Sequence, residues 1–247
     1  MTLLALKLVT AHFLTSFLIC RNAWIRTQAS KTWQGRLSGN LKNTAVFLLL
    51  SVLLIVPSAR PLDRLSMFLA IVIFALIRFG LEVALGVAAS KSWYGFTLLH
   101  VLHISAAVGL LAAVGSFPDL TDQLASTWAS SRTYLLISTY LFSAGFGSLV
   151  VPLVTAPLRP SDSDHRPTGI ENAGKYVGIL ERLLITTLII FWPNLDASAI
   201  GLVFSAKSIA RFPEFKKQHF AEYYLVGTLT SFMVAIAAGL IVRFFSI

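Results

Sequence analysis

The sequence predicts an all-α protein, a polytopic transmembrane helix bundle of about eight helices, with seven as the alternative. Hydrophobic residues make up 56% of its 247 residues, charged residues only 13%, and the mean hydropathy is +0.76. Soluble domains carry about a quarter charged residues, so this composition argues against a soluble class. A spanning helix needs roughly 20 apolar residues, so the chain accommodates seven or eight crossings and no sizeable soluble domain.

Eight apolar segments mark the expected helices, at residues 1–20, 43–56, 63–89, 96–115, 133–155, 170–192, 197–212 and 220–245. Most prolines fall at segment ends, where proline removes no helical hydrogen bond. Pro152 is the exception, because it lies near the end of the fifth segment, and we expect it to kink or end that helix. The second and seventh segments are short for a full crossing, so a half-crossing is an open alternative for each.

The first segment is predicted to be a retained helix and not a cleaved signal peptide. Lys7 lies inside the apolar run, and no small-x-small cleavage site precedes the basic stretch that follows. Cys20 is the only cysteine, so the chain forms no internal disulfide framework and no cysteine-rich metal site.

The basic residues predict the orientation. The connection over residues 21–42 has no acidic residue and five basic ones, namely Arg21, Arg26, Lys31, Arg36 and Lys42. Loops rich in Lys and Arg stay in the cytoplasm, so this loop is expected there, with both termini periplasmic in a bacterial-type inner membrane. The same rule explains the net charge of +9 without a nucleic-acid partner.

A linker divides the predicted bundle. The stretch over residues 156–169 is rich in Pro, Ser, Asp and Gly, residues typical of turns and breaks. We therefore expect a five-helix part at residues 1–156, a cytoplasmic linker at 157–169 and a three-helix part at 170–247. No internal repeat is apparent.

Ionisable residues inside the last three helices predict a ligand site. Each costs roughly 2.5–3.5 kcal/mol at the middle of a spanning helix, so each needs a partner or a function. If they face inward they form a cation-rich cavity open to the cytoplasm, suited to a phosphate, a carboxylate or a lipid head group. The predicted ligand-binding residues are Lys175, Glu181, Arg182, Lys207, Arg211 and Glu222.

A second polar group is expected from three of the front helices. Arg78 and Glu82 are four residues apart on one helix face and can pair, and His100 and His103 share a face of the next helix. With His12 they form the second predicted group. The histidine pair lacks a His-Glu-x-x-His element and a carboxylate cluster, so no metal site is assigned. No Walker, Gly-x-Ser-x-Gly or dinucleotide motif appears, so catalytic residues and cofactors stay unknown.

Small residues indicate where helices pack closely. Gly174 and Gly178 have a spacing that permits close approach of another backbone, and Ser143, Gly145, Gly147 and Ser148 form a second small-residue patch. The structural alternative is that the intramembrane charges pair with each other and fix helix packing. In that case Lys207, Arg211 and Glu222 extend their charged ends to the membrane–water interface.

The last third of the chain resembles an uncharacterised bacterial membrane protein family called domain of unknown function 3307. The resemblance is carried by GKYVGILERLLI at 174–185, AKSIARF at 206–212 and AEYYLVGTLTSF at 221–232. It implies that the six predicted ligand-binding residues are characteristic positions of the family. In the front half the family's polar pattern is reduced to Ala11-His12, Glu82 and His100. The resemblance implies no activity.

Three function classes follow from these patterns. The preferred one is a protein that binds or transports an anionic small molecule or lipid head group in the cytoplasm-facing cavity, and is not an enzyme. The second is a membrane-embedded enzyme, either a head-group transferase or a metal-dependent hydrolase that uses His12, His100 and His103 with Glu82. The third is a structural subunit or effector that docks a protein partner at the 21–42 loop.

Overall fold

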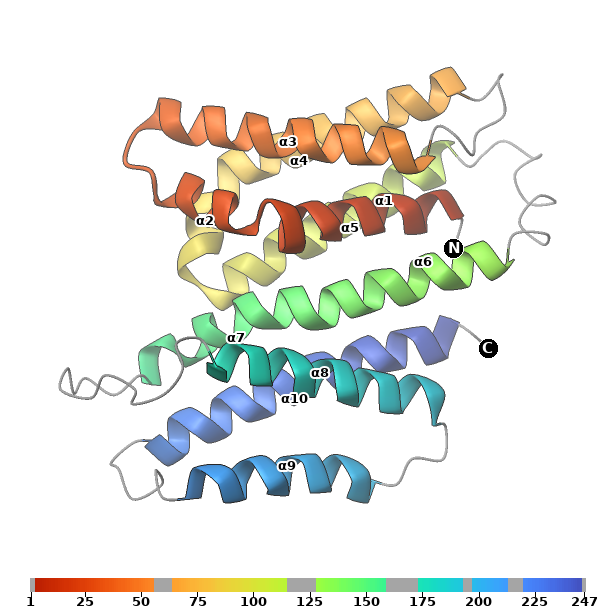
Figure 1. Cartoon of the computed structure of the whole chain (residues 1–247). Helices are drawn as coiled ribbons and strands as arrows, with labels where there is room; N and C mark the ends of the chain where they lie inside the picture. The colour runs from red at the N-terminus through yellow and green to blue at the C-terminus, as the bar shows by residue number, and fades with distance from the viewer. Residues whose placement is uncertain are drawn as a thin grey trace. The chain divides into compact units, whose positions relative to one another are not determined.

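The computed structural model describes residues 3–55, 64–114, 128–158, 173–192, 197–212 and 220–245, and these ranges are helical apart from short connections. The helices of the first half are α1 (Leu3–Phe13), α2 (Arg21–Ala29), α3 (Trp33–Ile55), α4 (Arg64–Lys91), α5 (Trp93–Val114) and α6 (Trp128–Leu141). They are followed by α7 (Gly147–Thr155), α8 (Ala173–Phe191), α9 (Ala197–Arg211) and α10 (Phe220–Phe245) (Figure 1). The all-helical prediction is confirmed.

Within the described ranges, five helical stretches are long and apolar enough to cross a membrane. They are Trp33–Ile55, Phe68–Lys91, Trp93–Leu110, Arg132–Leu158 and Phe220–Phe245, and a bent pair, Leu6–Ile19 with Asn22–Ala29, raises the number to six. Large apolar side chains such as Leu76, Leu180 and Met233 are more than 60% exposed, as expected of a lipid-facing surface. The chain is therefore a multi-pass membrane protein.

The prediction that residues 21–42 form a loop is wrong, because most of this stretch is helical. It contains α2 and the first turns of α3, so the second crossing has 23 residues and is long enough to span. The helix continues through polar residues because they have partners: the Gln28 side-chain amide donates to Asn40 Oδ1 at 2.9 Å, and both residues are buried. Glycines allow this contact, since Gly86 faces Gln28 and Gly39 faces Thr27 without a side chain between them.

The first helix breaks where it meets α2. A π turn over Leu14–Ile19 ends the helix, and α2 continues at 73° to the preceding helical axis. A second π turn, over Phe142–Phe146, joins α6 to α7. Pro152 lies inside α7, which continues to Thr155 and is followed by a 3₁₀ turn over Ala156–Leu158, so the proline does not end the helix at its own position.

The chain forms two compact units, Met1–Leu141 (unit 1) and Phe142–Ile247 (unit 2). Their boundary falls inside the fifth predicted segment and not at the linker, most of which lies outside the described residues. Unit 1 has a core that includes Leu8, Phe47 and Phe74, and unit 2 has one that includes Ile185 and Phe232.

Close helix packing in unit 2 occurs at Gly239 and not at Gly174. A Cβ atom at Gly239 of α10 would lie 2.7 Å from Cγ2 and 2.8 Å from Cβ of Ile189 on α8. By contrast, a Cβ atom at Gly174 would meet nothing within 4 Å in the described structure, and one at Gly178 would meet only Arg182. Among the described residues, the spacing of Gly174 and Gly178 is therefore not used for close helix packing. In the small-residue patch, Ser143, Gly147 and Ser148 are buried and Gly145 is partly buried.

Gly239→Ala is expected to lower the free energy of unfolding of the purified protein by about 1–3 kcal/mol, since the added methyl group forces α8 and α10 apart. Gly201→Ala in α9 is the matched control, because nothing in the described structure lies within 4 Å of its Cβ position. That change removes a flexible helical glycine and is expected to be neutral or stabilising by up to about 1 kcal/mol. Unfolding in a detergent series measures both, and equal stability of the two variants would contradict the packing.

Candidate functional site

Three buried histidines gather in unit 1. His12 comes from the end of α1, and His100 and His103 come from α5. The ring centroid of His12 lies 5.6 Å from that of His100 and 4.9 Å from that of His103, and the two α5 rings are 6.1 Å apart. His12 therefore meets two histidines that lie 88 and 91 positions later in the sequence.

Arg78 and Glu82 of α4 join this group. Arg78 Nη2 lies 2.9 Å from Glu82 Oε1, which confirms the predicted i, i+4 pair, and both side chains are almost wholly buried. Arg78 Nη2 also donates to Ser16 Oγ at 3.3 Å, and the guanidinium lies over the Phe47 ring at 5.0 Å. The structure thus brings together all five residues of the second predicted group. We call them the histidine–arginine cluster.

Aromatic packing and the local backbone hold the cluster in place. His100 Nδ1 is 2.9 Å from the carbonyl oxygen of Phe96, and the His100 ring lies against the rings of Phe96 and Phe17. The π turn begins two residues after His12 and carries Ser16 and Phe17. Single π turns in helices are frequent at functional sites, because the widened turn redirects the side chains around it.

Several polar atoms of the cluster are buried without a hydrogen-bond partner among the described residues. They include both ring nitrogens of His12, Nε and Nη1 of Arg78, and Oε2 of Glu82. A buried polar group left without a partner costs about 1–3 kcal/mol, and more when it is charged. Such atoms in a native structure indicate water, an ion or a ligand between them. These atoms make the cluster a candidate binding site.

The cluster does not have the geometry of a metal site. Within the described part of the chain, no group of three or more His, Cys, Asp or Glu side chains is arranged to hold a metal ion. One histidine nitrogen already faces a backbone carbonyl, and the Arg78 guanidinium places a positive charge beside the rings. The described residues thus offer the metal-dependent hydrolase no ligand set.

In unit 2, Arg182 is buried and held by four acceptors. Its Nε donates to the carbonyl oxygen of Ser143 at 2.8 Å, its Nη1 to Ser231 Oγ at 3.1 Å, and its Nη2 to Ser148 Oγ at 2.8 Å and the Ala144 carbonyl oxygen at 3.1 Å. The two carbonyls belong to the π turn, which interrupts the regular helical ladder and leaves carbonyls available to side-chain donors. Four of the five N–H groups of Arg182 are therefore used within the protein.

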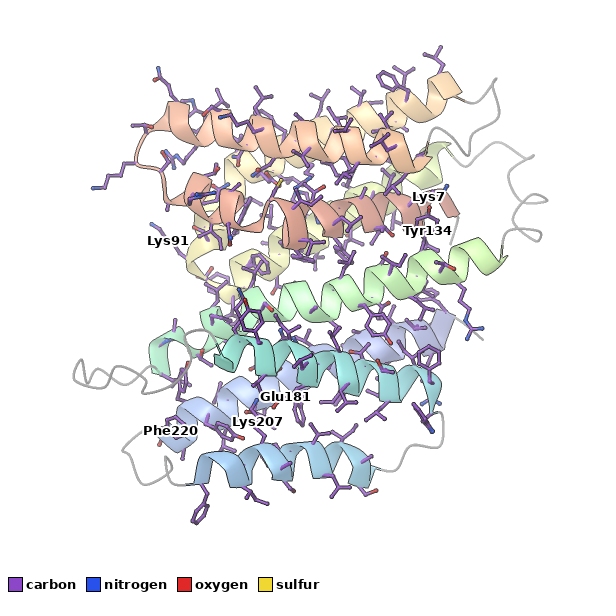
Figure 2. All side chains as sticks on the ribbon, in the orientation of Figure 1. Lys7, Lys91, Tyr134, Glu181, Lys207 and Phe220 are labelled. Atoms are coloured by element: carbon purple, nitrogen blue, oxygen red, sulfur yellow. The ribbon has the colours of Figure 1, made fainter. Side chains whose placement is uncertain are left out.

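Glu181 and Lys207 form a separate ion pair. Lys207 Nζ lies 2.6 Å from Glu181 Oε2, joining α9 to α8 (Figure 2). The ammonium is also 5.7 Å from the centroid of the Tyr224 ring. Although Glu181 and Arg182 are adjacent, their side chains reach different helices. This pair fits the structural alternative for these charges.

Two other members of the first predicted group lie at the surface of unit 2. Lys175 is exposed, with its ammonium 6.0 Å from the Tyr176 ring, and Glu222 is exposed on α10. Arg211 ends α9, and its side chain lies outside the described residues. The structure thus links Glu181 with Lys207 but does not bring Arg182 and Lys207 onto common partners.

Sequence reasoning treated Ser143 only as a packing residue and missed the hydroxyl pairs that join neighbouring helices. Ser143 Oγ and Thr186 Oγ1 are 2.8 Å apart beside Arg182, and Thr10 Oγ1 and Ser138 Oγ are 2.7 Å apart between α1 and α6. Lys7 is buried, with its ammonium 5.3 Å from the Tyr134 ring. Isolated Ser and Thr residues in apolar helices were the available signal, since such residues bond across helices.

No family model, curated protein or solved structure matches the chain. The resemblance of residues 174–232 to domain of unknown function 3307 stays a prediction. What fold and site define together is a class: a multi-pass helical membrane protein with a buried polar cluster among its helices.

Proposed function

We propose that this protein is a transport-type membrane protein that binds a small anion, together with a proton, in the histidine–arginine cluster. The observation that carries the proposal is the set of buried N–H donors with no acceptor in the part of the chain that the structure describes, at Nε and Nη1 of Arg78 and on the ring of His12. Buried donors of this kind favour an anion, because charge-assisted hydrogen bonds are about twice as strong as neutral ones.

The contacts in unit 2 favour this location over the cavity predicted from the last three helices. Arg182 has little donor capacity left for a ligand, and the Lys207 ammonium is paired with Glu181. In the cluster, by contrast, both described side-chain partners of Arg78, Glu82 and Ser16, are bound by its Nη2 group. The predicted anion-binding function is therefore retained, and we assign it to unit 1.

Histidine supplies a reason for the accompanying proton. Arg78 and Glu82 together are electrically neutral, so an anion alone would leave a net negative charge buried in the membrane. A proton taken up by His12, His100 or His103 would cancel that charge, because a protonated imidazole is a cation. The broken helix beside the cluster supports a transport role, because transporters form their sites at discontinuous helices.

We also propose the full predicted topology, with eight crossings and both termini periplasmic in an inner membrane. The number of crossings is seven or eight depending on whether α9 spans the membrane, and α9 has 15 residues. The charges of α8 support its insertion, since Glu181 and Arg182 have protein partners that lower their cost in the membrane.

Anion-dependent stability tests the function. The purified protein is melted in sodium formate, bicarbonate, chloride or phosphate, against the bulky anion gluconate at equal ionic strength. At a concentration ten times the dissociation constant, a bound anion adds about 1.4 kcal/mol, a rise of about 3–6 °C in Tm. The rise is expected to be larger at pH 6 than at pH 8, because a proton enters with the anion.

His12→Phe is the test variant, since it keeps a ring in the cluster and removes both nitrogens. The variant should fold and lose the anion-dependent rise in Tm. The control replaces two exposed cations, as Arg26→Gln/Lys91→Gln, and should keep that rise. Such a result excludes anion binding at these surface cations as its cause. If no small anion raises the Tm above that in gluconate, or if His12→Phe keeps the full rise, the proposal is wrong.

A further inference from the structure

We infer that one end of unit 1 is a binding surface for anionic phospholipid head groups, distinct from the buried cluster. The surface consists of α2, the turn into α3 and the junction of α4 with α5. These segments lie together, because Gln28 of α2 faces Gly86 of α4 and the Trp24 ring lies 5.9 Å from the ring of Phe96 on α5. We call this surface the basic end.

The basic end exposes cations and aromatic rings side by side. Arg26, Lys31 and Lys91 are exposed, and Arg36 stands with its guanidinium 5.7 Å from the Trp33 ring. Further exposed residues there are Trp33 (56%), Trp93 (49%) and Tyr94 (66%). Tryptophan and tyrosine concentrate at the level of lipid head groups, and cations there attract anionic lipids.

The geometry of α2 fits a helix lying along a membrane surface. It turns by 73° from the first helix, so if α1 crosses the membrane, α2 runs close to the membrane plane. Its face toward the protein is polar and fixed, with Thr27 and Gln28 buried, whereas its outer face exposes Ile25 next to Arg26. This outer face thus places an apolar side chain and a cation next to each other, where both can meet the lipid surface.

Charge complementarity selects the occupant. The chain contains no acidic residue before Asp63, so the cations of α2 and α3 have no carboxylate of their own segment to neutralise them. Partners with negative charge are therefore favoured, and the exposed rings beside membrane-spanning helices favour a lipid phosphate over a soluble acidic protein. Figure 2 shows Lys91 at this end of unit 1 and Lys7 with Tyr134 at the other.

The test compares lipids bound to the purified full-length protein. Native mass spectrometry measures how much phosphatidylglycerol and phosphatidylcholine the protein retains from an equimolar mixture. Wild type should prefer phosphatidylglycerol, and the preference should weaken in 1 M salt, which screens exposed charges. Each removed cation should lower the preference by about fivefold, so Arg26→Gln/Lys31→Gln/Lys91→Gln should nearly abolish it.

Two controls keep the outcome interpretable. Arg132→Gln removes one exposed cation from α6, two residues before Tyr134 and so at the opposite end of unit 1, and should leave the preference unchanged. Lys31→Arg/Lys91→Arg keeps the charges and should also retain it. If wild type shows no preference for phosphatidylglycerol, as expected of a surface that serves a protein partner, or if Arg132→Gln loses as much as the triple variant, the inference is overturned. Neither result depends on anion binding in the cluster.

Discussion

Arg182→Leu is expected to lower the free energy of unfolding by about 3–5 kcal/mol. The substitution removes four hydrogen bonds that cross between helices, each worth about 0.6 kcal/mol in membrane proteins. It also leaves the carbonyls of Ser143 and Ala144 with one donor fewer, and an unpaired buried acceptor costs about 1–3 kcal/mol. Unfolding in mixed detergent, followed by circular dichroism, measures the loss.

Two further variants separate the role of the guanidinium from that of charge. Arg182→Lys keeps the charge but cannot reproduce the fork that reaches four acceptors, so its stability should fall between wild type and Arg182→Leu. Lys175→Gln removes an exposed charge from the same helix and should change stability by less than about 0.5 kcal/mol. Equal effects of Arg182→Leu and Lys175→Gln would show that the contacts of Arg182 do not hold unit 2 together.

The buried pair in unit 1 is expected to show strong coupling. Arg78→Leu and Glu82→Leu each leave an uncompensated charge among helices, a change that costs about 3–5 kcal/mol. The double variant removes both charges, so its loss of unfolding free energy should be smaller than the sum of the losses in the two single variants. The difference, the coupling energy, should exceed about 1 kcal/mol. The four proteins are compared by the same unfolding measurement.

The double variant also separates folding from binding. Because Arg78 would no longer supply donors, the folded Arg78→Leu/Glu82→Leu protein should lose the anion-dependent rise in Tm. Additive single effects would indicate that the two side chains do not pair in the membrane. A double variant that keeps the anion response would remove Arg78 from the proposed site.

Much of the fold was predictable because apolar composition fixes where spanning helices lie. The last segment, at residues 220–245, coincides with α10, and the third lies within two residues of α4. The second was predicted to begin ten residues too late, because residues 33–42 are largely polar, although Asn40 and the next turn's Asn43 are buried. Their burial depends on contacts with α2 and other helices, which hydropathy along the chain does not report.

The sequence was enough to predict which residues belong to the candidate site, but not which residues contact each other. The i, i+4 spacing was enough to predict the Arg78–Glu82 pair, since neighbours on one helix depend only on local geometry. Spacing could not show that His12 meets two histidines of α5, or that Arg182 and Lys207 turn toward different helices. The acceptors of Arg182 were missed for a related reason, because two of them are backbone carbonyls of a π turn with no recognisable side-chain signature.

Solid-state NMR of ¹⁵N-histidine- and ¹⁵N-arginine-labelled protein in bilayers with ¹³C-formate tests the central claim most directly. If the cluster holds an anion, the formate carbon should show dipolar contacts to both a histidine ring and an arginine guanidinium, and His12→Phe should remove them. Formate that shows no such contacts, while water protons contact the same nitrogens, would mean that the unpartnered donors of Arg78 and His12 are hydrated and bind no anion.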